Sequence, residues 1–164
     1  MALRVLLLIC LSYLSTSVSA AEPDIQLQLN PVIYQRHITR MGKQGFAATD
    51  LSVYPGQRSE RFAVLGIKQT ESKDWKAYHG LDEKQLDIRL KQQATEGYHP
   101  LVISGYEKRG EPRFAIILTR SAAADSILKH SLPGNQLPST LKSLKEEGYA
   151  PCQLDGYTVN DQTF

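Results

Sequence analysis

The sequence GYHPLVISGY, residues 97–106, decides the fold because its pattern occurs three times in the chain. A glycine followed by an aromatic residue opens each copy, and a tyrosine closes it nine residues later. The glycines are Gly45, Gly97 and Gly148, spaced by 52 and 51 residues, and the tyrosines are Tyr54, Tyr106 and Tyr157. Self-similarity at a fixed period of this length indicates a repeat architecture.

A helix is predicted before each glycine, because apolar residues recur there at i, i+4 and i+7 and form one stripe. The stripe positions are Tyr34, Ile38 and Met41, then Leu86, Leu90 and Gln93, then Leu137, Leu141 and Leu144. Asn30-Pro31 and Asp82 are expected to cap the first two helices, and the third opens less clearly near Asn135. Each helix is expected to end at its glycine, which enters the left-handed region at little cost.

After the glycine the pattern changes to alternation, which is typical of a β-strand. In the middle copy, residues 101–106 alternate, 107–111 form a polar turn, and 113–119 are rich in β-formers, so we expect a hairpin. A short extended stretch, residues 75–79, is expected to link this hairpin's helix to the preceding copy. Residues 125–130 match it in register.

The expected fold class is therefore α+β, with tandem helix–strand–turn–strand units in about two and a half copies packing into one domain. We expect repeats at 29–80, 81–131 and 132–164, because one hairpin with one helix cannot bury its own apolar faces. The third hairpin lacks most of its second strand, which leaves an unpaired edge. Two readings remain open: the chain is a fragment, or a partner strand completes that edge.

The first twenty residues are predicted to be a signal peptide. A positive start (residues 1–4) precedes an apolar run (5–14) that is too short to span a bilayer. Small residues before position 21, ending Val18-Ser19-Ala20, predict cleavage after Ala20. We therefore expect an exported protein, periplasmic or extracellular, that meets a membrane only through its signal peptide. Cleavage would leave Cys152 as the single cysteine, expected to be a small buried hydrophobe.

The charge balance gives no case for nucleic acid as a partner, since 19 basic against 17 acidic residues leave a net charge of +2. The sequence has no phosphate-binding loop, dinucleotide fingerprint or zinc motif. We therefore expect no cofactor, no metal site and no catalytic residues.

The candidate binding residues are aromatic side chains and two histidines. Trp75, Tyr54, Tyr106 and Tyr157 are candidates for a groove that binds extracellular peptide or glycan, or are repeat-signature residues that plug the joint between helix and sheet. His79 and His130 fall on the same repeat position, where two histidines could bind metal or relay protons, or could each pack locally in their own unit. His37 and His99 do not recur in register and are expected at the surface.

Four strings carry a resemblance to a known family: Tyr78-His79-Gly80-Leu81, Gly97-Tyr98-His99-Pro100, Ser104-Gly105-Tyr106-Glu107 and Arg113-Phe114-Ala115-Ile116-Ile117. They resemble the bacterial tandem repeat found in the N-terminal region of polyglycine hydrolases, which are secreted serine peptidases with a β-lactamase-like catalytic domain. That domain's nucleophile has no counterpart here. The resemblance implies an exported, non-catalytic repeat module that binds or scaffolds extracellular polypeptide or cell-surface polymer. The alternative is the N-terminal fragment of a longer serine hydrolase of this kind.

Overall fold

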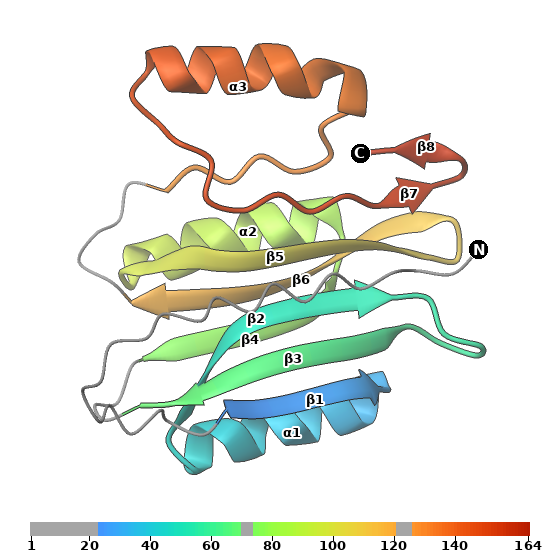
Figure 1. Ribbon diagram of the computed structural model, residues 1–164, viewed down its shortest axis with the longest axis vertical. Helices are drawn as coiled ribbons and strands as arrows, with labels where there is room; N and C mark the ends of the chain where they lie inside the picture. Colours follow the sequence, from blue (N-terminus) through green and yellow to red (C-terminus); the bar gives the residue numbers. More distant parts are fainter. Residues whose placement is uncertain (1–22, 70–73, 121–125) are drawn as a thin grey trace, which may run out of the picture.

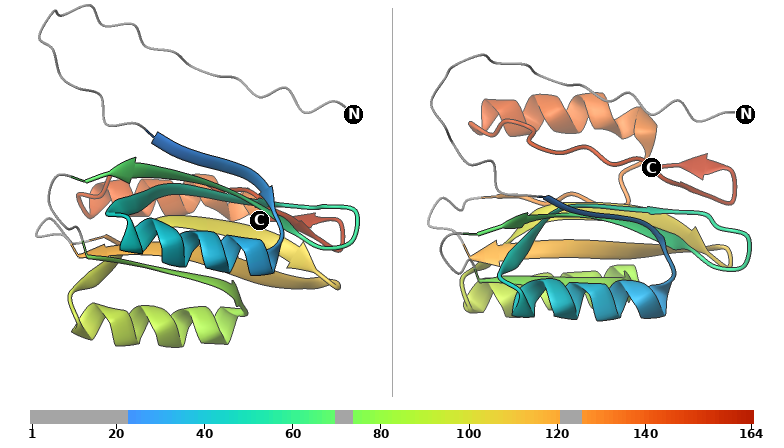
Figure 2. Two further views of the ribbon diagram at one scale, coloured as in Figure 1. Left: turned by 90° about the horizontal axis from the view of Figure 1, so that it is seen from below. Right: turned by 60° about the horizontal axis from the view of Figure 1, so that its bottom comes forward.

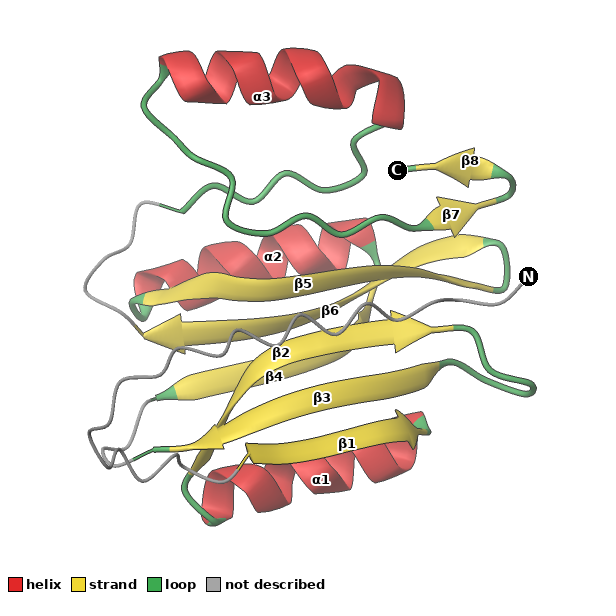
Figure 3. Ribbon diagram, viewed as in Figure 1, coloured by secondary structure: helices red, strands yellow, loops and turns green. Residues whose placement is uncertain are grey.

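A computed structural model describes residues 23–69, 74–120 and 126–164 (Figure 1). The predicted signal peptide, residues 1–20, lies outside the described residues. Helices and strands alternate along the chain in a mixed order, so the predicted α+β class is confirmed (Figure 3).

Two similar units make up most of the described chain. The first contains β1 (Pro23–Leu29), α1 (Pro31–Lys43), β2 (Phe46–Tyr54) and β3 (Arg61–Lys68). The second contains β4 (Trp75–Leu81), α2 (Glu83–Thr95), β5 (Tyr98–Lys108) and β6 (Glu111–Arg120). Each forms an antiparallel three-stranded sheet whose last strand lies in the middle, in the orders β1-β3-β2 and β4-β6-β5.

One prediction about the unit needs correction. The stretch at residues 75–79, expected as a linker, is the strand β4, and it pairs with β6 as an edge of the second sheet. The alternation of a single short strand is weak, and only its partner shows that it is paired. The observed unit is therefore strand, helix, strand, strand.

The predicted helix ends are confirmed. The Asn30 side chain accepts a hydrogen bond from the Ile33 N–H at 2.9 Å, and Asp82 forms a capping box with Gln85. The glycines that follow the three helices have φ values of 75°, 80° and 92°. These caps fix where each helix stops and where the following strand starts.

The sheets share their apolar faces. Beneath the first sheet lie both α1 and the second sheet, and beneath the second sheet lies α2 (Figure 2, left). The core cluster between them joins α1, the inner face of the first sheet and the outer face of the second, with members that include Tyr34, Met41, Phe62, Val64, Tyr106, Ala115 and Ile117. A second cluster, Leu86, Tyr98, Phe114, Ile116 and Leu118, fills the other face of the second sheet. Each unit therefore completes the core of the unit before it.

The third unit follows this plan only in part. It contains a 3₁₀ turn (Gly134–Gln136), α3 (Leu137–Glu146) and a hairpin of two-residue strands, β7 (Thr158–Val159) and β8 (Gln162–Thr163). Four residues of α1 and two of α2 are buried, whereas α3 buries none. The apolar stripe predicted for α3 is present, but no sheet covers it.

Gly45→Ala tests the role of the glycine that follows α1. A Cβ at Gly45 would meet nothing within 4 Å, so the cost is the left-handed backbone alone, about 1 kcal/mol of unfolding free energy. Urea unfolding measures it. The matched control is Gly42→Ala in the last turn of α1, where a Cβ would make an ordinary 3.9 Å contact with Trp75 and the higher helix propensity of alanine should leave stability equal or higher. Equal losses from both variants would contradict this account.

Candidate functional site

The units meet at junctions built from the same two kinds of contact. At the first junction the Val53 N–H, on β2, donates to the Ser104 hydroxyl at 3.0 Å. At the second the Gly105 N–H, on β5, donates to the Asp155 carboxylate at 2.7 Å. The donors occupy equivalent repeat positions, and so do the acceptors. A backbone donor at a sheet edge is thus satisfied by the next unit's side chain.

An aromatic cluster lies beside each of these hydrogen bonds. The ring of Phe62 in the first unit lies 5.3 Å from that of His79 and 6.3 Å from that of Tyr106. The ring of Phe114 in the second unit lies 5.4 Å from His130 and 5.6 Å from Tyr157. All four contacts are edge-on, the geometry that rings of this kind favour.

These clusters place four of the candidate residues at the junctions. His79 and His130 each lie against a phenylalanine, Phe62 or Phe114, of the same predicted repeat (29–80 or 81–131). The sheets, however, assign each histidine to the unit that follows its phenylalanine. Tyr106 is buried, and a Cβ on Gly105 would come within 2.2 Å of the Tyr157 ring. Only glycine at position 105 leaves room for that ring.

The other two candidates hold the first unit together and to its neighbour. The Trp75 indole donates to the Phe46 carbonyl at 3.0 Å, which ties β4 to the first unit. The Tyr54 hydroxyl accepts from the Gln28 N–H at 3.0 Å. Gln28 has a positive φ, as do Gly80 and Ser131 at the matching positions. In β1 and β4 this residue lies where the pairing with the middle strand shifts register, so it marks a β-bulge.

An ion pair adds charge to the first junction. Glu60 is 8% exposed and its carboxylate lies 2.7 Å from the Lys108 ammonium. Burial opposes the charged carboxylate, but the hydrogen bond from Lys108 holds the pKa of Glu60 below its usual value. Burial lowers the pKa of His79 and raises that of Tyr106 to about 12. The cluster therefore holds neutral rings beside one charged pair.

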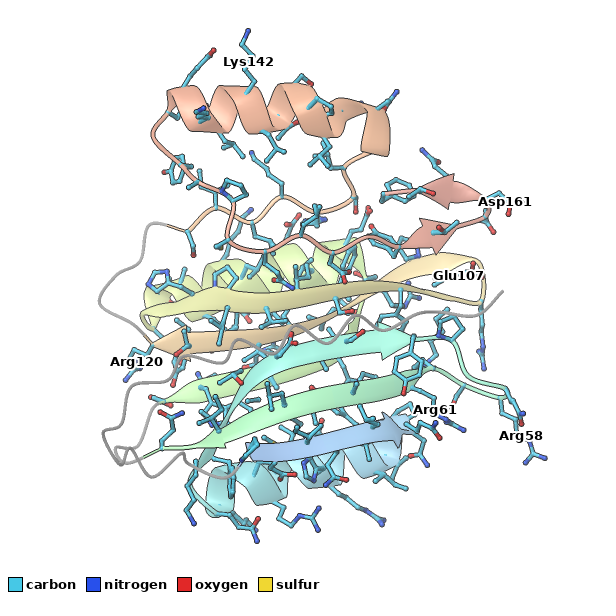
Figure 4. All side chains as sticks on the ribbon, in the orientation of Figure 1. Arg58, Arg61, Glu107, Arg120, Lys142 and Asp161 are labelled. Carbon is cyan, nitrogen blue, oxygen red and sulfur yellow. The ribbon has the colours of Figure 1, made fainter. Side chains whose placement is uncertain are left out.

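A shallow depression of about 420 Å³ lies next to this ion pair, between the first and second units. The turn ends of the β2–β3 and β5–β6 hairpins border it. Tyr54 and Tyr106 line it, and Arg58 and Glu107 stand at its rim (Figure 4). Charges of both signs surround it, so it favours no single class of charged ligand.

A larger cleft, of about 860 Å³, lies between β5 and α3. Its lining is mainly apolar and includes Leu101, Ile103, Ile127, Leu137, Leu141, Leu144, Tyr149 and Leu154. Two segments of the third unit, residues 126–132 and 150–157, lie where the first two units have their edge strands. No middle strand lies between these two segments to pair with them. This cleft is the strongest candidate binding site in the described chain.

Side chains attach the third unit to β5 where a strand ladder is absent. The Gln153 amide accepts from the Ile103 N–H at 3.0 Å and donates to the Ile103 carbonyl at 2.8 Å. Asn160 donates to the Gly110 carbonyl at 3.0 Å. The sequence did not reveal these roles, although Gln153, a polar residue where the middle copy has Val102, was the available signal. Cys152, expected to be buried, is exposed because residues 150–157 form no strand that would cover it.

His37 also departs from expectation. Predicted at the surface, it is 3% exposed in α1, with Nε2 3.2 Å from an Asp24 carboxylate oxygen and Nδ1 2.7 Å from Arg40. Asp24 is on β1, whose strand character the alternating pattern did not reveal. Burial is the main cause that lowers the pKa of His37.

The described residues contain neither a metal-ligand cluster nor a membrane-spanning helix. Across residues 23–69, 74–120 and 126–164, no group of three or more His, Cys, Asp or Glu side chains is placed to hold a metal ion. Within the same part of the chain, no helix has the length and apolar character needed to cross a bilayer.

The shared cores and the recurring junction contacts define a tandem-repeat α+β protein. A family model described as "Polyglycine hydrolase-like, structural repeat" matches residues 26–65, 72–121 and 124–164. The chain therefore belongs to this family, as its sequence motifs predicted. No curated protein and no solved structure matches the chain.

Asp155→Ala should weaken the second junction, because the Gly105 N–H loses its acceptor. Leaving such a donor unpaired costs about 1–3 kcal/mol. Asp155→Ser is the matched rescue, since the first junction uses a serine at the equivalent position. Amide exchange of Gly105 and urea unfolding measure the effect. Faster exchange in the alanine variant and recovery in the serine variant are expected, and equal exchange in both would contradict the assignment.

The partly buried His79 should make the free energy of unfolding decrease as the pH is lowered. Its folded pKa lies below the unfolded value of about 6.5, so the unfolded chain binds the proton more readily and stability declines as pH drops through that value. His79→Leu should reduce the loss in urea midpoint between pH 7.5 and 5.5. His37 remains, so the loss should not vanish. His99→Leu, outside the junction, is the control, and a slope unchanged by His79→Leu would contradict the prediction.

Proposed function

We propose that the chain is an exported, non-catalytic repeat module whose third unit binds an extended polypeptide strand. The apolar cleft of about 860 Å³ carries this proposal. In the first two sheets the middle position is filled by β3 or β6, which have 8 and 10 residues. The corresponding strand of the third unit, β8, has two.

The repeat register supports the strand as the ligand. Phe164, which pairs with Tyr157, is equivalent to Arg61 and Arg113, and in those units the strand continues as FAVLGIK (62–68) and FAIILTR (114–120). The cleft begins at Phe164 and runs between residues 126–132 and 150–157. An inserted strand would find unpaired backbone on both sides, which is the basis of β-augmentation.

The lining favours a particular kind of strand. α3 presents Leu141 and Leu144 to one wall, and β5 presents Leu101 and Ile103 to the other. Because successive side chains of a strand point to opposite faces, aliphatic residues are favoured at neighbouring positions of the ligand, as in β6. A glycan fits less well, since most of the lining is aliphatic and, of the two tyrosines in it, Tyr149 and Tyr157, the second already stacks on Phe164.

Export is part of this proposal and rests on the N-terminal sequence pattern. A strand donated by residues following Phe164 in a longer polypeptide is the alternative occupant, as expected of a serine hydrolase with a repeat region. The intact mass of the natural product distinguishes the two, because a mass for residues 21–164 requires the strand to come from another chain.

A labelled peptide with the sequence of residues 115–120, AIILTR, tests the cleft directly. We expect saturable binding by fluorescence anisotropy, weakened at least about tenfold, or 1.4 kcal/mol, when alternate peptide amides are N-methylated. Methylation keeps the side chains but removes the donors that a ladder needs. Oligoglycine should bind more weakly, since it cannot fill the apolar walls.

Protein variants locate the bound peptide. Leu141→Asp in the cleft should reduce binding, whereas Ile88→Asp on α2 should not, although both residues are partly exposed on a helix (39% and 47%). Binding that is indifferent to N-methylation or to Leu141→Asp would rule out the strand-acceptor function.

A further inference from the structure

The middle strand of each complete unit has a buried phenylalanine near its start. Phe62 and Phe114 are 0% and 1% exposed. Each directly follows an arginine that pairs with the tyrosine near the end of the neighbouring strand. In the third unit Phe164 pairs with Tyr157 in the same way. The first residue of a strand inserted beyond Phe164 therefore takes the place of Phe62 and Phe114, and we call that place the anchor position.

Phe62 shows what surrounds this position in a complete unit. The two edge strands place Leu29 and Val53 opposite it. The helix places Tyr34 against it, with the two rings stacked at 4.3 Å, and rings of the following unit close the fourth side. The second unit repeats the first three walls with other side chains, which around Phe114 are Leu81, Gly105 and Leu86. Two of these walls differ between the units, yet both units enclose a phenylalanine.

The third unit has the same three walls, and all of them line the cleft. Leu132, Gly156 and Leu137 each follow their counterparts in the second unit by 51 residues. A Cβ on Gly156 would meet the Phe164 carbonyl oxygen at 3.8 Å and nothing nearer. The wall at Gly156 therefore leaves room for a large side chain at the anchor position.

The start of α3 lies close to the anchor position. A Cβ on Gly134, just before the helix, would lie 3.9 Å from the Thr163 carbonyl oxygen, so this end of α3 is beside the end of β8 (Figure 1). Leu137 is the first residue of the helix, and both it and Leu132 are only half-buried. A ring at the anchor position would cover the apolar surface that these two leucines leave exposed.

The residue after the phenylalanine is alanine in both complete units. Successive residues of a strand point to opposite faces, so Ala63 and Ala115 point away from the helix of their unit. Ala115 is 0% exposed and belongs with Phe62 to the core cluster between the first and second units. In the third unit the corresponding face lies against Phe114, which lines the cleft and packs edge-on against Tyr157. A small side chain is therefore expected at the second position of the ligand.

We propose that the cleft selects strands that begin Phe-Ala. The phenylalanine ring is held between Leu132, Leu137 and Gly156, and the alanine is directed toward Phe114. This specificity rests on the strand-acceptor function proposed above and adds an anchor to it. Ladder hydrogen bonds alone accept any extended chain, whereas a buried ring fixes both the register and the sequence of the bound strand.

Three peptides of equal length test the anchor. They are FAIILTR, which is the sequence of residues 114–120, its variant AAIILTR, and AFIILTR, in which the first two residues are exchanged. All are acetylated at the N-terminus and labelled at the C-terminus, so they differ only in side chains. Because three of the four sides are present, we expect FAIILTR to bind the mature chain about tenfold more tightly than AAIILTR by fluorescence anisotropy. AFIILTR has the composition of FAIILTR but should gain little over AAIILTR, because its ring points toward Phe114.

Variants at Leu137 locate the ring. The ratio of the affinities for FAIILTR and AAIILTR should fall at least about threefold in Leu137→Ala, which removes one wall. Leu137→Tyr should keep the ratio, since Tyr34 stacks on Phe62 at the equivalent place in the first unit. Ile88→Ala, at an exposed apolar position on α2 outside the cleft, is the control and should leave the ratio unchanged. Circular dichroism checks that each variant is folded.

The outcomes separate the anchor from the strand-acceptor function. Equal binding of FAIILTR and AAIILTR, an equal gain for AFIILTR, or an affinity ratio unaffected by Leu137→Ala overturns the anchor. In each of those cases, binding of AAIILTR that is weakened by N-methylation of its amides leaves the strand-acceptor function standing. If none of the peptides binds, the function and its anchor both fail.

Discussion

Every unit of this protein depends on a sheet face that it cannot cover by itself. The inner face of the first sheet is too wide for α1, and the second sheet fills the remainder with Tyr106, Ala115 and Ile117. The Val53 N–H is satisfied by the same neighbour. Burial of apolar surface supplies the stabilising free energy, and the hydrogen bond sets the register between units. Neither contact exists within a single repeat.

This dependence explains why the third unit differs. Its segments reproduce the junction with β5 through Asp155 and Tyr157, yet α3 buries no residue. The third unit's contacts with the second come from Asp155 and Tyr157, which occupy the position of an edge strand. Burial of the apolar stripe of α3 would require a full middle strand. The unit is therefore attached at its base and open under its helix. That separation gives the molecule a binding cleft without loosening the two complete cores.

Local rules in the sequence predicted most of the architecture. The glycine spacing, the helix caps and the hairpins are read from neighbouring residues, because φ > 0 and capping are local properties. The strand character of β4, the burial of His37 and the exposure of Cys152 depend on partners distant in sequence. The same holds for the candidate site. The repeat register identified the recurring tyrosines and histidines, but it did not predict that their rings pack across the junctions between units. Gln153 bonds to Ile103 through its side chain where a strand ladder is absent, and the repeat marked it only as a polar residue in the place of Val102.

The nested arrangement also governs the order in which the chain can be taken apart. Among the described sheets, the second has a neighbouring unit on both of its faces. Its central strand β6 is therefore the strand best shielded from solvent. Opening can begin at the third unit, held largely by side-chain contacts, while the paired cores persist. A force applied at the C-terminus would meet those weak attachments first. The protein could thus release and recapture its last unit many times within the lifetime of one folded molecule.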